Sequence, residues 1–363
     1  MTLLFREERQ AGSLPVTAVP ATLVRGGTSK CWIFRDEDLP ADPQETERLL
    51  IRTFGSPDLR QIDGVGGASS TTSKAITVGG TDPDGTVHYR FAQVAIDKPA
   101  VEWASNCGNC ATALGLYALH AGLVTPTGDV TRVPILNTVT GLRLICEIPT
   151  PGAQVPAYGG RRLDGQHYPG VPIDVVFQKT SWSSYGAQFP TGNALDDIDV
   201  DGQRYQATLI DAGAPAALFD AQDLGLDATG SEEALAALVR IAPQLRAAAA
   251  RKMNLPQNLS SIPKVGVVGP PPEGTTGVSA RMISMSALHP AIGLTSAVAV
   301  AAASGTEGSV VQRNMVPAAE AGLSIHLLKG KTALALDAAD PAEVSFQRSA
   351  RVISESTILV PND

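Results

Sequence analysis

The sequence predicts an α+β protein built from two similar halves. Its 363 residues exceed the need of one ordinary domain, since domains typically contain about 100–200 residues. Short stretches that alternate apolar and polar residues, as strands do, recur along the whole chain. The stretches 102–122 and 284–305 each run from a polar turn into an Ala-rich helix that ends at a glycine. This similarity favours two domains of one topology, although two unrelated Ala-rich helices would give the same pattern.

The composition is that of a globular protein, with 44% hydrophobic and 18% charged residues. A net charge of -8 argues against nucleic acid as a partner, but not against a small anion, because a local patch can override net charge. The first ten residues are too short and too acidic for a signal peptide. The most apolar run, 292–303, is too short to span a bilayer. We therefore expect a cytoplasmic protein without a membrane partner.

The first half is predicted to consist mostly of strands. A strand, a glycine turn and a second strand occupy 16–34, and a helix capped by Asp42 occupies 45–54. The helix that begins near Cys107 ends at Gly122, which suits the position just after a helix. Further strands are expected at 74–78, 86–94, 134–148 and 172–177, with an irregular excursion at 151–168.

The second half repeats this mixture. Its predicted helices are a long Ala- and Leu-rich one at 232–253 and an apolar one at 293–303. Its predicted strands are 198–200, 205–210, 264–268, 277–285, 322–336 and 344–353.

Two segments rich in glycine and hydroxyl groups are candidate ligand loops. The glycines of Arg25-Gly-Gly-Thr-Ser-Lys30 let the backbone approach a ligand, although an ordinary hairpin turn explains this segment equally well. The segment 61–78 holds one lysine, Lys74, directly before an apolar strand. A partly desolvated amine can act as a base there. Flexibility alone is the simpler explanation of this loop.

Cys107 stands at the start of the first apolar helix. Unpaired backbone N–H groups and the positive end of the helix dipole meet there, so we expect a lowered thiol pKa and a site for a carboxylate. Cys107 and Cys110 also form a C-x-x-C pair, which occurs in redox and zinc sites. A zinc site needs a second pair of ligands, and neither His120 nor Cys146 supplies one at metal spacing. The four cysteines are too irregularly spaced for a disulfide framework.

Together these segments resemble the PrpF family, which has the diaminopimelate-epimerase-like fold. The resembling segments, in order along the chain, are Arg25–Lys30, Asp63–Gly67, Ser73-Lys74, Asn106–Asn109, Pro190–Asn193, Asp211–Pro215, Ser284-Met285 with His289, and Phe346–Arg351. The resemblance implies two pseudo-symmetric β-barrel-like domains, each wrapped around a central helix, with the active site in the cleft between them. It assigns 11–185, completed by the strand 350–363, to the N-terminal domain and 186–349 to the C-terminal domain.

Known members of the family are Δ-isomerases and tautomerases of unsaturated polycarboxylates: methylaconitate, aconitate, methylitaconate and oxalomesaconate. Lys74 and Cys107 match the family's catalytic Lys and Cys, which lie on opposite faces of the substrate. One group would remove an allylic proton and the other would deliver a proton at the far end of the double bond. Which of them is the base stays open. The scheme requires no metal and no organic cofactor, and family proteins are often dimers, so a homodimer is compatible with it.

The resemblance also implies a set of substrate-binding residues around this pair. They supply the hydroxyl, amide, imidazole, guanidinium and backbone N–H groups that hold carboxylates and an enolate oxygen. The expected set is Arg25, Gly27, Thr28, Ser29, Ser73, Asn106, Gly108, Asn109, His289, Thr295 and Ser296.

Two departures from the family pattern affect the expected chemistry. The His-Pro-Ser-Gly turn of the family is replaced at 324–331, where Lys329 or Lys331 would suit a different number of carboxylates. The second-half cysteine of amino-acid epimerases has no counterpart, because Gly293, Thr295 and Ser296 stand in that region. This favours double-bond migration over two-thiol racemisation. The alternatives are an epimerase or racemase of an amino or hydroxy acid, and a non-catalytic accessory protein that binds a polycarboxylate.

Overall fold

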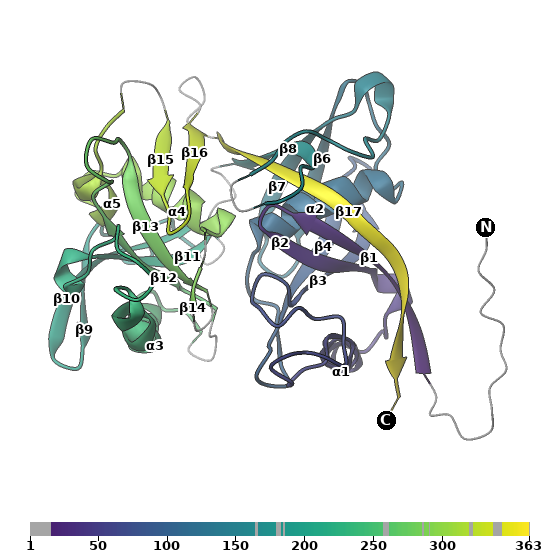
Figure 1. Cartoon of the computed structure of the whole chain (residues 1–363), viewed down its shortest axis with the longest axis horizontal. Helices are drawn as coiled ribbons and strands as arrows, with labels where there is room; N and C mark the ends of the chain where they lie inside the picture. Colours follow the sequence, from purple (N-terminus) through teal and green to yellow (C-terminus); the bar gives the residue numbers. More distant parts are fainter. Residues whose placement is uncertain are drawn as a thin grey trace.

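The computed structural model describes residues 16–163, 166–178, 183, 186–256, 261–284, 287–289, 291–318, 322–336 and 343–362. Figure 1 shows two lobes side by side, each rich in strands and each containing one central helix. These helices are α2 (Gly108–His120) in the first lobe and α4 (Leu294–Ser304) in the second. Almost every residue of both helices is buried, which fits helices that are apolar on all sides. The fold is therefore α+β with two domains, as the sequence predicts.

The first lobe is formed by the strands from the first half of the chain and by the last strand. The strands are β1 (Val16–Gly26), β2 (Ser29–Arg35), β3 (Lys74–Thr81), β4 (Val87–Val94), β5 (Val101–Glu102), β6 (Val130–Asn137), β7 (Arg143–Pro149), β8 (Val171–Gln178) and β17 (Glu343–Pro361). Helix α1 (Pro43–Phe54) packs on the outside, and the Asp42 side chain caps it by accepting a hydrogen bond from the Gln44 N–H, as expected.

In its described residues the second lobe contains the remaining strands and three α-helices. The strands are β9 (Asp196–Val200), β10 (Gln203–Ala212), β11 (Ala214–Asp220), β12 (Lys264–Gly269), β13 (Val278–Ser284), β14 (Ala287–Leu288), β15 (Leu323–His326) and β16 (Lys331–Leu336). The helices are α3 (Ala236–Lys252), α4 and α5 (Val310–Asn314). Among the described residues no helix is both long and apolar enough to cross a membrane.

Three features of this lobe differ from the sequence prediction. Helix α3 begins at Ala236, because residues 232–235 form a turn. Strand β11 was not predicted, since all its residues are buried and it therefore lacks the alternation of a half-buried strand. Helix α5 was also not predicted, because its five residues are too few to show helical periodicity.

The two lobes repeat one order of strand pairing. In the first lobe β1 and β2 are antiparallel, β2 and β3 are parallel, and β3 and β4 are antiparallel. In the second lobe β10, β11, β12 and β13 follow the same sequence of pairings. The parallel pairing of β4 with β6 is matched by that of β13 with β15. The internal similarity in the sequence is thus a repeat of topology.

The last strand connects the two lobes. Strand β17 pairs with β16 at Val344 and Ser345, and with β8 from Glu343 to Ala350. It then pairs with β1 as far as Pro361, and Figure 1 shows it crossing the first lobe. Because β17 already pairs with β8 at Glu343, the C-terminal strand joins the first lobe before residue 350, where the sequence analysis placed the start of its contribution to that lobe.

One hydrophobic core runs through both lobes. Leu114 of α2 and Val298 of α4 belong to the same cluster of buried side chains. The helix N-termini meet closely, since a Cβ on Gly108 would lie 2.4 Å from the Leu294 Cβ. This continuous packing fixes the position of one lobe against the other and therefore the shape of the space between the two helix ends.

Each central helix also packs tightly against a glycine of a neighbouring hairpin. A Cβ on Gly26 would lie 2.0 Å from the Asn109 carbonyl oxygen and 2.7 Å from the Ala113 nitrogen, both in α2. The corresponding contact in the second lobe is that of Gly213, in the turn between β10 and β11, with Thr295 and Val298 of α4.

We predict that Gly26→Ala lowers the free energy of unfolding by about 1–3 kcal/mol, because the new methyl group meets backbone atoms that cannot move aside. Urea unfolding followed by circular dichroism measures the change. Gly80→Ala is the control, since its Cβ would meet nothing within 4 Å. Equal stability of the two variants would contradict the packing described here.

Candidate active site

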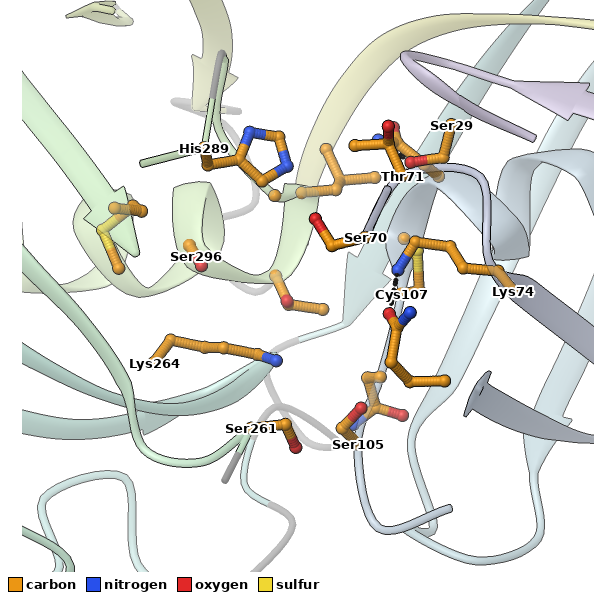
Figure 2. Close-up of a pocket in the computed structure, with 18 of the residues that line it drawn as sticks. Ser29, Ser70, Thr71, Lys74, Ser105, Cys107, Ser261, Lys264, His289 and Ser296 are labelled. Atoms are coloured by element: carbon orange, nitrogen blue, oxygen red, sulfur yellow. Dashed lines mark hydrogen bonds between the residues drawn. The ribbon is translucent and has the colours of Figure 1, made fainter. Parts of the chain in front are cut away.

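A cavity lies between the lobes, where the N-termini of α2 and α4 face each other (Figure 2). Its lining residues come from the start of β2, the loop before β3 and the start of β3, β4, the start of α2, the start of β12 with the loop before it, the region from β13 to His289, and the start of α4. They are Ser29, Ser70, Thr71, Lys74, Phe91, Gln93, Ser105, Asn106, Cys107, Gly108, Asn109, Ser261, Lys264, Met282, Ile283, His289, Gly293, Leu294, Thr295 and Ser296. None of the described residues in this lining is Asp or Glu, so the cavity suits an anionic ligand.

Lys74 is the first residue of β3, and its side chain is buried. Its Nζ donates a hydrogen bond to the Gln93 Oε1 at 2.5 Å and lies 5.0 Å from the centre of the Phe91 ring. The Gln93 side chain is held in turn by donation from its Nε2 to the Ser73 carbonyl oxygen, at 2.8 Å. The β3–β4 pairing, which places Lys74 opposite Gln93, therefore aims one amine into the cavity.

Cys107 is the N-cap of α2, and its Sγ accepts a hydrogen bond from the Cys110 N–H at 3.4 Å. The Cys110 thiol and burial raise the pKa of the Cys107 thiol well above its ordinary value. Lys74 and the Cys110 N–H act in the opposite direction but do not reverse the shift. The expectation of a lowered pKa at this helix end is therefore wrong, and Cys107 is a protonated thiol at neutral pH.

Lys264 reaches into the cavity from the opposite lobe. Figure 2 shows its amine and that of Lys74 approaching from opposite sides. Burial lowers the pKa of Lys264 to about 8, with Lys74 adding to this effect and Glu102 opposing it. The sequence analysis did not identify Lys264 as a site residue. The internal repeat contains the signal, because Lys264 begins β12 as Lys74 begins the equivalent β3.

His289 lies on the same side of the cavity as Lys264 and has a neutral imidazole. Burial lowers the pKa of His289 to about 4, and the charge of Lys74 adds to this. The His289 Nδ1 accepts a hydrogen bond from the Ala291 N–H at 3.1 Å. The neutral ring therefore carries its proton on Nε2, which makes it an uncharged donor.

The structure brings nine of the residues named from the sequence into this cavity. They are Ser29, Lys74, Asn106, Cys107, Gly108, Asn109, His289, Thr295 and Ser296. Asn106 also ties the lobes together, since its Nδ2 donates to the Gly213 carbonyl oxygen at 3.3 Å. Its Oδ1 accepts hydrogen bonds from Asn137 and Thr140, so its orientation is fixed.

Ser73 does not line the cavity. It is fully buried, and its Oγ donates to the Val94 carbonyl oxygen at 2.9 Å and accepts from the Gln61 Nε2 at 2.8 Å. The hydroxyl is therefore used inside the lobe and does not face the cavity. The Ser73 carbonyl oxygen accepts the hydrogen bond from Gln93, so we reassign Ser73 as a residue that positions Gln93 and, through it, Lys74.

The turn at 25–29 is also not placed as expected. Arg25 and Gly27 lie outside the central cavity and line a separate groove. Thr28 lines that groove and also a small cavity shared with Lys329, Lys331 and Arg348. Among the described lining residues of the central cavity, only Ser29, the first residue of β2, comes from this segment.

The cysteine pair has no metal-binding partners within the described part of the chain. No group of three or more His, Cys, Asp or Glu side chains there could hold a metal ion. All four cysteines are free thiols, and Cys31, Cys110 and Cys146 are buried.

Two strand-rich lobes with a cavity between two central helix ends define the diaminopimelate-epimerase-like fold. A solved methylitaconate-delta-isomerase has the same fold, with a TM-score of 0.75, 26% identity and coverage of 95% of this chain and 96% of that one. A sequence model of the family described as PrpF protein matches residues 16–361. The chain therefore belongs to the PrpF family.

Two relatives with named activities agree with this placement. The chain is 39% identical over 303 residues to a 4-oxalomesaconate tautomerase of Pseudomonas putida, with 82% of each chain covered. It is 35% identical to a (4E)-oxalomesaconate Delta-isomerase of a Novosphingobium species, with 94% of this chain and 98% of the relative covered. The chain is an isomerase of this family.

The raised pKa of Cys107 predicts a slow reaction with iodoacetamide near neutral pH, because the thiolate, and not the thiol, attacks this reagent and displaces its iodide. The rate of alkylation should still be rising with pH at about pH 9, above the ordinary thiol pKa of about 8.5. Mass spectrometry of the Cys107 peptide measures the rate, and Cys107→Ser gives the background. A rate that levels off near neutral pH would show a thiolate instead.

Proposed function

We propose that this protein moves a C=C bond by one position in an unsaturated di- or tricarboxylic acid, by proton transfer at the two ends of an allylic system. The observation that carries the proposal is the joint placement of the Lys74 amine and the protonated Cys107 thiol in one cavity. The cationic Lys264 of the lining, without carboxylates among the described lining residues, suits a polycarboxylate. The names of the oxalomesaconate and methylitaconate isomerases support this substrate class.

In the proposed reaction Lys74 is the base and Cys107 is the acid. The amine of Lys74 takes a proton from the allylic carbon, and the electron pair left behind spreads through the double bond into a carboxyl group. The Cys107 thiol then gives its proton to the carbon at the far end of the former double bond. This leaves an ammonium and a thiolate, and one proton transfer between them restores both groups. The raised pKa of Cys107 supports this assignment, because a thiol must hold its proton in order to deliver it.

The helix ends supply the donors for the negative charge of the intermediate. Gly293 precedes α4 and has no side chain, so no side-chain cap occupies the first N–H groups of this helix. The start of α2 at Gly108 faces them across the cavity. Backbone N–H groups in this arrangement can hold a carboxylate and stabilise the charge that develops on it.

Lys264 has the role of a cation that binds substrate carboxylate in this scheme. Its Nζ faces the cavity opposite Lys74 (Figure 2). A pKa of about 8 leaves Lys264 mostly charged at neutral pH. The charged ammonium attracts a carboxylate by the Coulomb interaction, and the neutral amine does not.

The equivalent positions of Lys74 and Lys264 favour one second candidate. An epimerase needs two opposed acid–base groups at a single carbon, and two lysines from matching strands of the two lobes meet that description. Optical rotation of single-enantiomer amino and hydroxy acids, incubated with the protein, would change if this candidate is correct.

The central test is deuterium exchange into candidate unsaturated acids in D2O, followed by proton NMR. Lys74→Ala should slow exchange at the allylic carbon by about 100-fold or more, since it removes the base. Cys107→Ser should slow delivery at the far carbon, because a hydroxyl is a much weaker acid than a thiol.

Cys110→Ser should keep most of the exchange activity, whereas a redox mechanism through the C-x-x-C pair would lose it. Unchanged exchange in both Lys74→Ala and Cys107→Ser would refute the proposed roles.

The lowered pKa of Lys264 leads us to predict that kcat/KM depends on pH. Because Lys264 is protonated below its pKa and neutral above it, kcat/KM should fall as the pH rises through about 8. Lys264→Met should raise KM by about tenfold and lose this part of the profile. Lys98→Met, which removes an exposed surface lysine, should keep the wild-type profile. A Lys264→Met profile that still falls at the same pH would assign the titration to another group.

A further inference from the structure

A groove on the outer side of the turn at 26–29 contains a group of cations without a carboxylate among its described lining residues, and one of them, Arg351, lies over the Tyr168 ring at 5.6 Å. The groove has a volume of about 320 Å³, and its basic lining residues include Arg25, Lys30 and Arg351. None of its described lining residues is Asp or Glu. Such a concentration of positive charge is notable in a chain with a net charge of -8.

Two of these cations stand directly opposite each other. Arg25 of β1 is the register partner of Arg351 of β17 in the antiparallel pair. Like charges at opposed positions of neighbouring strands destabilise a sheet. Burial lowers the pKa of the Arg25 guanidinium, and Arg351 adds to this. The two side chains therefore repel each other where water screens them only in part.

Hydrogen bonds within the protein do not compensate for this arrangement. The Arg25 Nη1 donates to neutral acceptors, the carbonyl oxygens of Gly27 and Ser349 and the Ser349 Oγ, at 3.1–3.2 Å. The Arg25 Nη2 and the Arg351 Nε are buried and have no hydrogen-bond partner among the described residues. Buried donors without partners are rare in native proteins and call for a physical reason, such as an ion.

We propose that this groove is a second anion-binding site, separate from the reaction cavity, for a small multivalent anion such as phosphate or a polycarboxylate. An anion there would offset the repulsion between Arg25 and Arg351. Lys30 would add a third cation, and the hydroxyls of Thr28 and Thr72, which also line the groove, are suitable donors.

The groove is separate from the reaction cavity but shares a wall with it. Lys74 and Cys107 do not line the groove, whereas Ser29 lines both spaces. The Asn109 Nδ2 donates to the Thr28 Oγ1 at 3.1 Å and to the Ser29 Oγ at 3.3 Å. An anion in the groove would therefore contact the outer side of a turn whose inner side borders the substrate.

The test compares melting temperatures of the full chain in sodium phosphate and in sodium chloride of equal ionic strength, which removes general screening as an explanation. Phosphate should raise the melting temperature of the wild type above the value in chloride. Arg351→Met should melt at or above the wild type in chloride, because the opposed charge is gone, and should gain nothing from phosphate. Arg132→Met, which removes an exposed arginine paired with Glu147 elsewhere, should keep the gain.

Should Arg351→Met fold poorly, Lys30→Met provides a second variant. Its affinity for phosphate, measured by titration calorimetry, should be at least about fivefold weaker than that of the wild type. Equal stabilisation by chloride and phosphate, or a full phosphate effect in both variants, would overturn the proposal. Neither measurement uses turnover, so the result does not depend on the proposed isomerase reaction.

Calorimetry with propane-1,2,3-tricarboxylate, a saturated acid that cannot isomerise, distinguishes the source of the anion. Two molecules bound per wild-type chain and one per Arg351→Met chain would identify a carboxylic acid as an occupant. One molecule bound to each chain, with the phosphate gain still lost in Arg351→Met, would identify inorganic phosphate. Both results support the site, and two molecules bound to each chain with no phosphate effect would contradict it.

Discussion

The close contact between the N-termini of α2 and α4 determines the chemistry that the cavity can support. Gly108 lies against Leu294 with no room for a Cβ, so two positive helix ends face each other across a small space. Such ends repel, and the hydrophobic core shared by the lobes must hold them together. An anion between them relieves the repulsion. The backbone therefore selects an anionic ligand before any side chain contributes.

The repeat of topology is not a repeat of chemistry. Both lobes place a lysine at the start of an equivalent strand, Lys74 in β3 and Lys264 in β12. The helix caps differ, since Cys107 precedes α2 and Gly293 precedes α4. An enzyme that inverts one carbon needs similar groups on two sides, whereas a proton shift along an allylic system has two different ends. The unequal caps fit the second kind of reaction.

The sequence was sufficient to predict the fold class, most of the strands and the placement of Lys74 and Cys107 in one cavity, because local patterns and family motifs carry that information. It was not sufficient for properties that depend on neighbours distant in the chain. The pKa of Cys107 has the opposite shift from the expected one because burial and Cys110 outweigh the helix end. Lys264 reads as the start of an ordinary strand until the lobes come together. Arg25 lies in the right turn but on its outer side.

The pairing of β1 with β17 has a consequence for synthesis of the chain on the ribosome. Val16 pairs with Pro361, so one sheet joins the first and last described strands, and all of the second lobe is inserted between β8 and β17. The second lobe can gather its own strands while translation continues, but the first must wait until β17 has been synthesised and has left the exit tunnel. The part that is made first is therefore completed last, and until then the edge of β1 toward β17 has no neighbour to shield it from other chains.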